Sequence, residues 1–403
     1  MALDFSGQNL RGRNFKGQDL AGANFSYADI RGANFTNANL TGANFSHVKA
    51  GLQRRWATFL VIVSFLLSGL SGYLWAVNGY FVSQIFDTSR LENRISGWVA
   101  LIVLIAFFFI TIRQGIIAGL GAVAVAVAGA FAGAGAVAGA FAGAGAFAVA
   151  GAVAGTLFSI YISWRAMKGD QKHSLIRNIT IAFAATGGTS FRGANLTNAD
   201  FTQAILKSTD FRNTSLICSR WYQAKMLDRV RPGLTYLQYA QVRQLLVTGQ
   251  GQDTNFDRQN LRGINLQAAN LADTSFIGAD LSEANLQDAD LSRAKLKQTQ
   301  LDGTDLTGAT LTGAYIEDWG ITNTTKLHGV RCEYVFMRLP TKEDPDPLRK
   351  PDNKREVFAD GDFADFIKPI FDTLDLYHNQ GVDPRAIAIA LKNLAENHPE
   401  AEL

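Results

Sequence analysis

An apolar residue recurs at every fifth position over three stretches of this chain, and a small residue, mostly alanine, lies two positions before most of these apolar centres. In an α-helix each fifth residue is rotated by about 140°, so the apolar positions would wind around the outside. In a flat strand the odd spacing would place successive centres on opposite faces. A coil with four sides, one side for each repeat, points every centre inward. The expected core centres include Phe5, Phe25, Phe45, Phe191, Phe201, Phe211, Phe256, Leu261, Leu266, Leu271, Phe276 and Leu281.

The five-residue period therefore predicts a β fold in which successive turns of the coil stack at the spacing of strands, about 4.8 Å. Glycine and asparagine recur at the corners, where a positive φ costs little. In the first turn, Gln8, Arg13 and Gln18 occupy positions that elsewhere hold a small inward residue. We expect this first turn to be irregular or frayed.

Phenylalanine alternates with leucine or isoleucine as the centre in the first block of repeats, which places phenylalanine on two opposite faces of the coil. One further repeat follows with a degenerate centre, Ala50, and Phe191 then resumes the alternation in phase. We therefore predict that the block at residues 1–50 continues directly into the block at 190–216. Residues 51–189 are then an insertion into a single coil.

The segments RGANFTNANLTGANF, from Arg31, and IGADLSEANLQDADLSRAKL, from Ile277, closely resemble the pentapeptide-repeat family, whose motif is A(D/N)LXX. The resemblance implies a right-handed quadrilateral β-helix. Segments in the second interruption of the repeats and near the C-terminus are similar to a cyanobacterial group of pentapeptide-repeat proteins. This second resemblance implies a thylakoid or plasma membrane location and brings no established activity.

The insertion contains long uncharged stretches of the length that crosses a bilayer, which takes about 20 apolar residues. Basic residues precede the first stretch and follow the second and the fourth. Because cations mark the cytoplasmic side, we expect a multi-pass integral membrane protein with its N- and C-terminal regions in the cytoplasm. No Asp, Glu, Lys or His lies inside a span, which argues against an ion relay. The four expected transmembrane helices cover about residues 56–77, 97–114, 115–138 and 141–164.

Alanine alternates with other residues through the last two of these spans, a period of two that resembles silk-like strands. An open sheet would leave backbone groups unsatisfied in lipid, so helices are favoured. Glycines at a spacing of four, namely Gly129, Gly133, Gly139 and Gly143, would permit close helix packing and a homo-oligomer. The alternative is a low-complexity expansion, because AGAFAGAGA occurs twice in tandem.

A second interruption, residues 217–255, is predicted to be a helical insert with short helices over 221–230 and 237–247. Its aromatic and basic residues form a candidate docking surface for a protein partner or for anionic lipid headgroups. The alternative is a helical clip that packs against the coil. The candidate docking residues are Trp221, Tyr222, Tyr236 and Arg243.

The main block of repeats is expected at residues 256–337 and is followed by a charged, proline-containing linker at 338–361. The remaining residues, 362–403, have the pattern of a small α-helical hairpin. Its second helix can be capped by Asp383, with Pro384 at the first helical position. The predicted fold class is thus a β-helix with a four-helix transmembrane insertion and a C-terminal helical hairpin.

The composition and the spacing of the reactive residues argue against nucleic-acid coating, metal binding and catalysis. The chain has 38 Lys and Arg against 35 Asp and Glu, a net charge of +3, which argues against a protein that coats nucleic acid. Cys218 and Cys332 are far apart, and the five histidines are scattered, so we predict neither a disulfide framework nor a metal site. No nucleophile–base pair or phosphate-binding loop is present in the sequence. We expect no catalytic residues, no cofactor and no enzymatic activity.

The leading hypothesis is a non-enzymatic, membrane-tethered scaffold whose cytoplasmic β-helix binds an unidentified protein partner. A second hypothesis is a DNA mimic that binds a topoisomerase, a role that the resemblance implies for soluble relatives. Such a mimic needs a long acidic surface, yet residues 256–321 hold only ten acidic against five basic side chains. A third hypothesis is a factor that positions or exports a membrane lipid. It depends only on the combination of four spans with pentapeptide repeats, which is similar to that of a heterocyst glycolipid-localisation protein.

Overall fold

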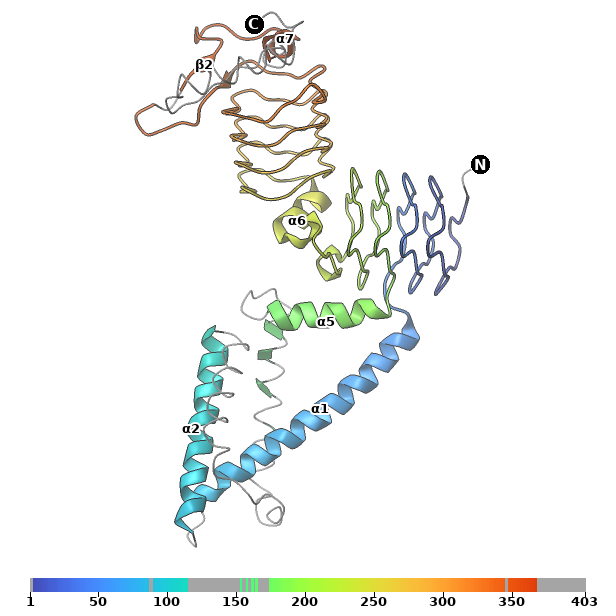
Figure 1. The fold of residues 1–403 in the computed structure, drawn as a ribbon, viewed down its shortest axis with the longest axis vertical. Helices are drawn as coiled ribbons and strands as arrows, with labels where there is room; N and C mark the ends of the chain where they lie inside the picture. Colours follow the sequence, from blue (N-terminus) through green and yellow to red (C-terminus); the bar gives the residue numbers. More distant parts are fainter. Residues whose placement is uncertain are drawn as a thin grey trace, which may run out of the picture. The chain divides into compact units, whose positions relative to one another are not determined.

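The computed structural model describes residues 3–86, 90–114, 174–344 and 347–367, with a few single positions between 153 and 165. The chain forms two compact units, residues 1–250 with 262–265, and residues 251–261 with 266–403. Each unit contains a coil of five-residue repeats, drawn in blue and green for the first unit and in yellow to red for the second (Figure 1).

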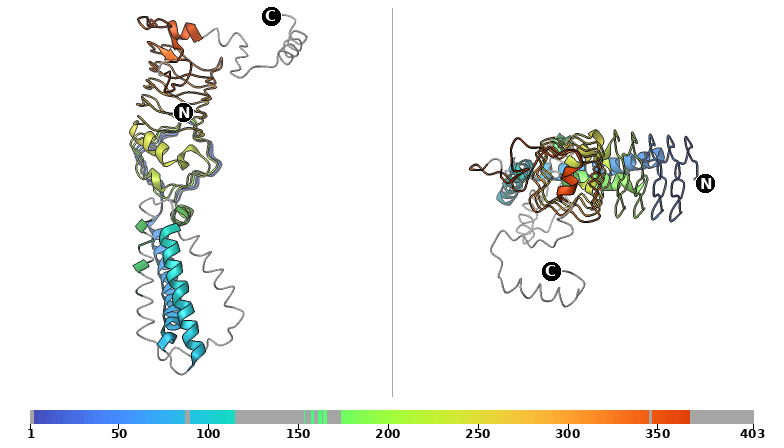
Figure 2. Two further views of the ribbon diagram at one scale, coloured as in Figure 1. Left: turned by 90° about the vertical axis from the view of Figure 1, so that its left-hand side faces the viewer. Right: turned by 90° about the horizontal axis from the view of Figure 1, so that it is seen from above.

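The backbone of the first coil is held by hydrogen bonds between successive turns. The amide of each centre donates to the turn that follows, as in Phe25 N to Asn44 O at 2.7 Å, and the residue before each centre forms a parallel bridge twenty residues on, as in Asn24 with Asn44. Within each corner a small residue donates back to the preceding centre, as Ala28 does to Phe25 at 3.0 Å. The predicted four-sided coil is therefore confirmed, and the left view of Figure 2 shows its closed outline.

The coil runs across the insertion without a break. Asn34 forms a parallel bridge with Ser190, although 156 positions of sequence separate them, and the Phe35 amide donates to the Ser190 carbonyl at 2.7 Å. The next bridges join Asn39 to Asn195 and onward in the same register. The predicted continuity of the first two blocks of repeats is confirmed.

Two columns of stacked aromatic rings fill this first coil. Within a column the ring centroids are 4.6–5.3 Å apart, and rings of opposite columns meet edge to face. Phe191 stacks on Phe35 at 5.0 Å and Phe201 stacks on Phe45 at 5.0 Å, so both columns cross the insertion point. One column is Phe5, Phe25, Phe45, Phe201 and Trp221, and the other is Phe15, Phe35, Phe191 and Phe211.

The expectation of an irregular first turn is wrong. Its bridges and hydrogen bonds are regular, and Phe5 N donates to Asn24 O at 2.7 Å. The side chains of Gln8, Arg13 and Gln18 are exposed, and the Gln8 amide donates back to the Asp4 carbonyl at 3.2 Å. At the open end of a coil a long polar side chain can turn outward, so the backbone keeps its course. For the same reason Phe5 is only half-buried, whereas the eleven other expected core centres are buried.

The described part of the insertion is helical. α1 (Arg54–Ser83) contains the first expected span, a short turn η1 (Gln84–Phe86) follows, and α2 (Leu91–Gln114) contains the second. Within the described residues one helix, Leu91–Arg113, is long and apolar enough to cross a membrane by length and composition. α5 (Ser174–Thr186) leads back to the coil. The third expected span, most of the fourth and the four glycines proposed for helix packing, Gly129, Gly133, Gly139 and Gly143, lie outside the described residues.

The first coil also extends further than expected. Trp221 occupies a coil centre, and bridges join Asp200 to Arg220 and Ile205 to Lys225. The helix expected over residues 221–230 is therefore wrong, because stacking of the indole on the aromatic column keeps this stretch in the coil. The rest of the insert contains three short helices, and it is bonded to the last turns of the first coil, as in Gln223 N to Val247 O at 2.9 Å. The helices are η3 (Leu227–Arg229), η4 (Tyr236–Gln238) and α6 (Ala240–Thr248).

The second coil runs from the bridge of Asn255 with Ser275 to that of Tyr315 with Phe336. At the end of this coil β1 (Val335–Phe336) pairs antiparallel with β2 (Arg349–Lys350). β2 lies inside the segment that was expected to be a linker. α7 (Asp362–Ile367) follows and buries Phe363 near Trp319, with ring centroids 6.4 Å apart. The second coil is thus closed by a hairpin and a short helix, and the rest of the expected helical hairpin lies outside the described residues.

Candidate interaction site where the inserted helices leave the coil

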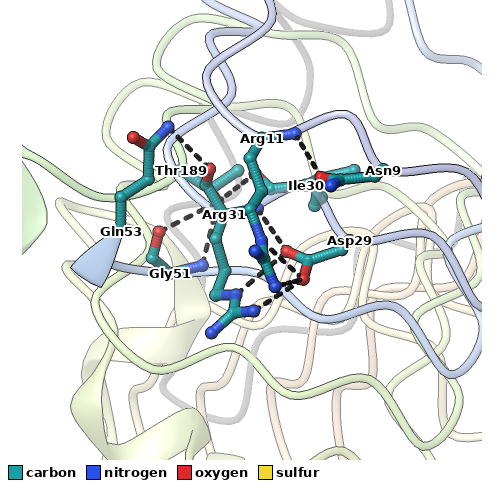
Figure 3. Close-up of polar contacts among 8 residues, drawn as sticks. All are labelled: Asn9, Arg11, Asp29, Ile30, Arg31, Gly51, Gln53 and Thr189. Carbon is teal, nitrogen blue, oxygen red and sulfur yellow. Dashed lines mark hydrogen bonds and ion pairs between the residues drawn. The ribbon is translucent and has the colours of Figure 1, made fainter. Parts of the chain in front are cut away.

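The chain leaves the first coil after Ala50 and returns to it at Thr189. The Gly51 amide donates to the Thr189 hydroxyl oxygen at 2.9 Å, and this hydroxyl donates to the Ile30 carbonyl at 2.8 Å (Figure 3). The buried Gln53 side chain donates to the Arg31 carbonyl at 3.0 Å. Both ends of the insertion are thereby fastened to one turn of the coil and to each other.

Close backbone approach at this junction requires glycine. Gly51 has φ +118°, and a Cβ there would lie 2.0 Å from the Lys207 carbonyl oxygen. A Cβ on Gly188 would lie 1.9 Å from the carbonyl oxygen of Ser208. No real side chain is accommodated at such distances, so two glycines allow the departing and returning segments to pass between turns of the coil.

Replacing Gly51 with alanine is expected to destabilise the protein by about 2 to 4 kcal/mol, because the new Cβ overlaps a backbone oxygen in a strained conformation. Gly17→Ala is the matched control. Gly17 also has a positive φ, +67°, but nothing lies within 4 Å of its Cβ position, so the cost should be about 1 kcal/mol. Denaturation of the full chain in detergent, followed by circular dichroism, measures both. Equal losses would contradict the close approach.

Beside the junction, Asp29 is held by two arginines. Its carboxylate accepts hydrogen bonds from Arg11 at 2.9 Å and from Arg31 at 2.9 and 2.7 Å. Burial raises the pKa of Asp29, but the hydrogen bonds and charges of Arg31 and Arg11 outweigh this effect and hold the pKa well below its ordinary value. The carboxylate stays ionised and is fully engaged by these two side chains.

Asp29→Asn should cost about 1 kcal/mol at neutral pH, a value reduced by solvent screening because Arg11 remains half-exposed. Since the folded pKa is lowered, the stabilisation is complete above the ordinary aspartate pKa, near 4, and is lost as the pH falls further. Thermal melts of both proteins should therefore differ at pH 7 and converge toward pH 2. Asp19→Asn, at a site whose neighbour is the neutral amide of Asn39, is the control.

Charge is distributed unevenly around the first coil. We call the face with centres Leu10, Ile30, Ala50 and Leu206 the junction face, because the chain leaves the coil directly after Ala50. The residues that flank these four centres include one carboxylate, Asp29, and a second carboxylate, Asp228, lies in the turn with Lys225. The opposite face, with centres at 20, 40, 196 and 216, has Asp19 as the single charged residue at the corresponding positions. The cations of the junction face are Arg11, Arg31, Lys49, Lys207 and Lys225.

The four expected docking residues differ in how far their side chains are exposed. Trp221 and Tyr236 are buried, the indole Nε1 donates to the Tyr236 hydroxyl at 3.2 Å, and that hydroxyl donates to the Leu216 carbonyl at 2.8 Å. Desolvation raises the pKa of Tyr236, so it stays neutral. Arg243 donates to the backbone carbonyls of Leu237 and Gln238. Docking by Trp221 and Tyr236 is therefore wrong, because these rings hold the insert onto the coil, whereas Tyr222 is 53 % exposed.

No group of three or more His, Cys, Asp or Glu residues in the described ranges has the geometry of a metal site. Cys332 is buried, and desolvation raises the pKa of its thiol to about 12, which keeps it protonated and unreactive.

A family model described as pentapeptide repeats matches the chain with eight copies, over residues 3–37, 19–50, 187–217, 252–288 and 284–318. These ranges lie within the two coils, which continue past residues 217 and 318. No curated protein sequence matches the chain significantly.

Among solved structures, the chain is similar to HetL, a pentapeptide repeat protein involved in heterocyst differentiation regulation from the cyanobacterium Nostoc, at 13% identity over 83% of this chain and 90% of HetL, with a TM-score of 0.24. It is similar to Rfr23 of the cyanobacterium Cyanothece at 24% identity over 36% of this chain and 60% of Rfr23, with a TM-score of 0.13. It is also similar to QnrB1, a plasmid-mediated fluoroquinolone resistance protein, at 12% identity over 82% of this chain and 93% of QnrB1, with a TM-score of 0.21.

TM-scores this low carry no argument, and the assignment depends on the repeats themselves. The family model and the hydrogen-bonded four-sided coils agree over the same residues. The two coils of this chain are therefore built of pentapeptide repeats.

Proposed function

We propose that this protein is a non-enzymatic scaffold that is tethered to a membrane by the insertion and binds a protein partner with its coil. The observation that carries the proposal is the unbroken coil across the insertion. The turn that holds Asn34 bridges directly to Ser190, so the insertion does not interrupt the hydrogen bonding between these turns. The stretch between the two ends of the insertion supplies no turn of the coil, and its apolar composition suits lipid.

The exposed apolar surface of α2 supports the tether. Only 11% of the most apolar stretch of the helix Leu91–Arg113 is buried, and an exposed apolar surface of this size is unfavourable in water. Residues 56–77 in α1 carry no charge, and Arg54 and Arg55 precede them. Trp56, 40 % exposed, lies between these arginines and the uncharged stretch, and tryptophan is enriched at such ends of transmembrane helices.

The charges disfavour a DNA mimic. Residues 3–55 and 187–250 together hold fifteen Lys and Arg against six Asp and Glu. A surface that imitates a phosphate backbone would have to be acidic along its length. The first coil would repel a partner that binds DNA through cations.

Alkaline carbonate extraction of native membranes tests the tether. The full chain should stay in the membrane pellet, and its release into the supernatant would refute membrane tethering. Crosslinking mass spectrometry on the same membranes tests the scaffold. Recovery of a defined protein partner supports it, and crosslinks confined to this chain and lipid would refute it.

Three exposed apolar side chains of the insert supply a sharper test of the partner surface. Tyr222 is 53 %, Met226 44 % and Leu234 90 % exposed. Tyr222→Ser combined with Leu234→Ser should remove most partner crosslinks. The matched control is Val357→Ser in the second unit, which is 56 % exposed and should leave them unchanged.

A further inference from the structure

The junction face presents a row of cations that the fold itself does not use. Lys49, Lys207 and Lys225 are exposed. Lys49 and Lys225 belong to one column of parallel bridges, from Asp29 through Lys49 and Ile205 to Lys225, and Lys207 lies two residues after Ile205 in the same turn. Neighbouring members of such a column are about 4.8 Å apart, so the row reaches across the first coil. Asp29 already binds two arginines, and Asp228, in the turn that follows Lys225, forms an ion pair with Arg229 at 3.8 Å. The cations of this face thus outnumber its carboxylates.

The row continues into the first turn of α1. Arg54 and Arg55 begin this helix, and the Arg55 guanidinium lies 3.5 Å from the Cβ position of Gly12, beside Arg11. The next residue is the half-exposed Trp56, and the stretch that follows is uncharged. The cations therefore end where the apolar helix begins, which is the order of groups at the surface of a bilayer.

We infer that the junction face is a binding surface for anionic lipid headgroups and holds the first coil against the membrane leaflet. The inference rests on the proposed function, because the lipid must be within reach. Clustered Lys and Arg immediately beside an apolar helix bind acidic lipids through charge that falls off within a Debye length. The opposite face, whose flanking positions hold Asp19 and neutral residues, has no such affinity and remains available to a protein partner.

The native lysines provide the test without any substitution. The full chain is placed in nanodiscs of phosphatidylcholine alone or with phosphatidylglycerol, and the rate of lysine acetylation is read by mass spectrometry. Lys49, Lys207 and Lys225 should react about fivefold more slowly with the anionic lipid present. Lys16, an exposed lysine of the same coil that flanks Phe15 and not a centre of the junction face, is the internal control and should react equally in both. Protection should vanish in 1 M NaCl, where the Debye length is about 3 Å.

Each outcome is decisive. Equal reactivity of the three junction lysines in both lipids, with the chain retained in alkali-washed membranes, would overturn this inference and leave the tether intact. Release of the chain by alkali would overturn the tether and the lipid surface together. Stronger protection by a short DNA duplex in detergent than by anionic nanodiscs would assign the face to nucleic acid instead and refute the lipid.

Discussion

Deletion of residues 52–187 is expected to give a protein that needs no detergent and keeps the whole first coil. Joining Gly51 to Gly188 leaves five residues, Gly51 and 188–191, from one centre to the next, so the period is restored. The bond from Gly51 to Thr189 and the stack of Phe35 on Phe191 are already in place in the full chain. Gly188 can adopt the positive φ that corners of this coil require. Solubility, circular dichroism and a crystal structure of the deletion protein measure the result.

A deletion that is one residue longer, 52–188, is the control. It leaves four residues, Gly51 and 189–191, from one centre to the next, so the returning repeats can no longer align both their side chains and their backbone hydrogen bonds with the preceding turn. We expect this protein to aggregate or to lose its near-ultraviolet signal from the aromatic columns. If both deletions fold equally well, the two blocks do not depend on a shared register, and the continuity described above would be refuted.

Phe45→Ala should destabilise the protein by about 3 to 5 kcal/mol, because it opens a cavity in a core that packs rings on every side. Phe45 is fully buried, stacks on Phe25 at 4.9 Å and on Phe201 at 5.0 Å, and meets two further rings edge to face. Its position also joins the blocks on either side of the insertion. Thermal and chemical denaturation of the full chain in detergent measure the loss.

Phe5→Ala is the matched control in the same column. Phe5 stacks on Phe25 from one side and is half-buried at the open end of the coil. Its loss should cost about 1 to 2 kcal/mol, since aromatic pairs contribute about 0.5 to 1.5 kcal/mol each beyond area burial. A cost at Phe5 equal to that at Phe45 would show that the stack does not transmit packing across the insertion point.

The coil and its continuity could be predicted because the five-residue period specifies both the inward positions and the phase. The stretch at 221–230 was missed because only its centre Trp221 and the small residue Ala224 keep the repeat, whereas the other residues suit a helix equally well. The spacing of twenty residues from Phe201 to Trp221 was the available signal. Packing of the indole against the column overrides local helical preference, which sequence patterns do not reveal.

The docking residues were misjudged for a related reason. An aromatic residue in an interruption of repeats can be exposed or buried, and the sequence contains no measure of which. The buried hydrogen bond from Trp221 to Tyr236 shows that these two rings face inward, and it is visible only in the three-dimensional structure. The junction face shows the converse, since Lys49 and Lys207 are far apart in sequence and become neighbours only when the turns are aligned across the insertion.

The hydrogen bond between Gly51 and Thr189 also imposes a rule of parity. Both ends of the insertion are held at one turn of one coil, so they lie on the same side of any bilayer that the intervening chain enters. Every crossing must then be matched by a return crossing, and an odd number of spans is impossible while that bond exists. A mutation that turns one span into a surface helix should therefore convert its neighbour as well, or pull the coil apart.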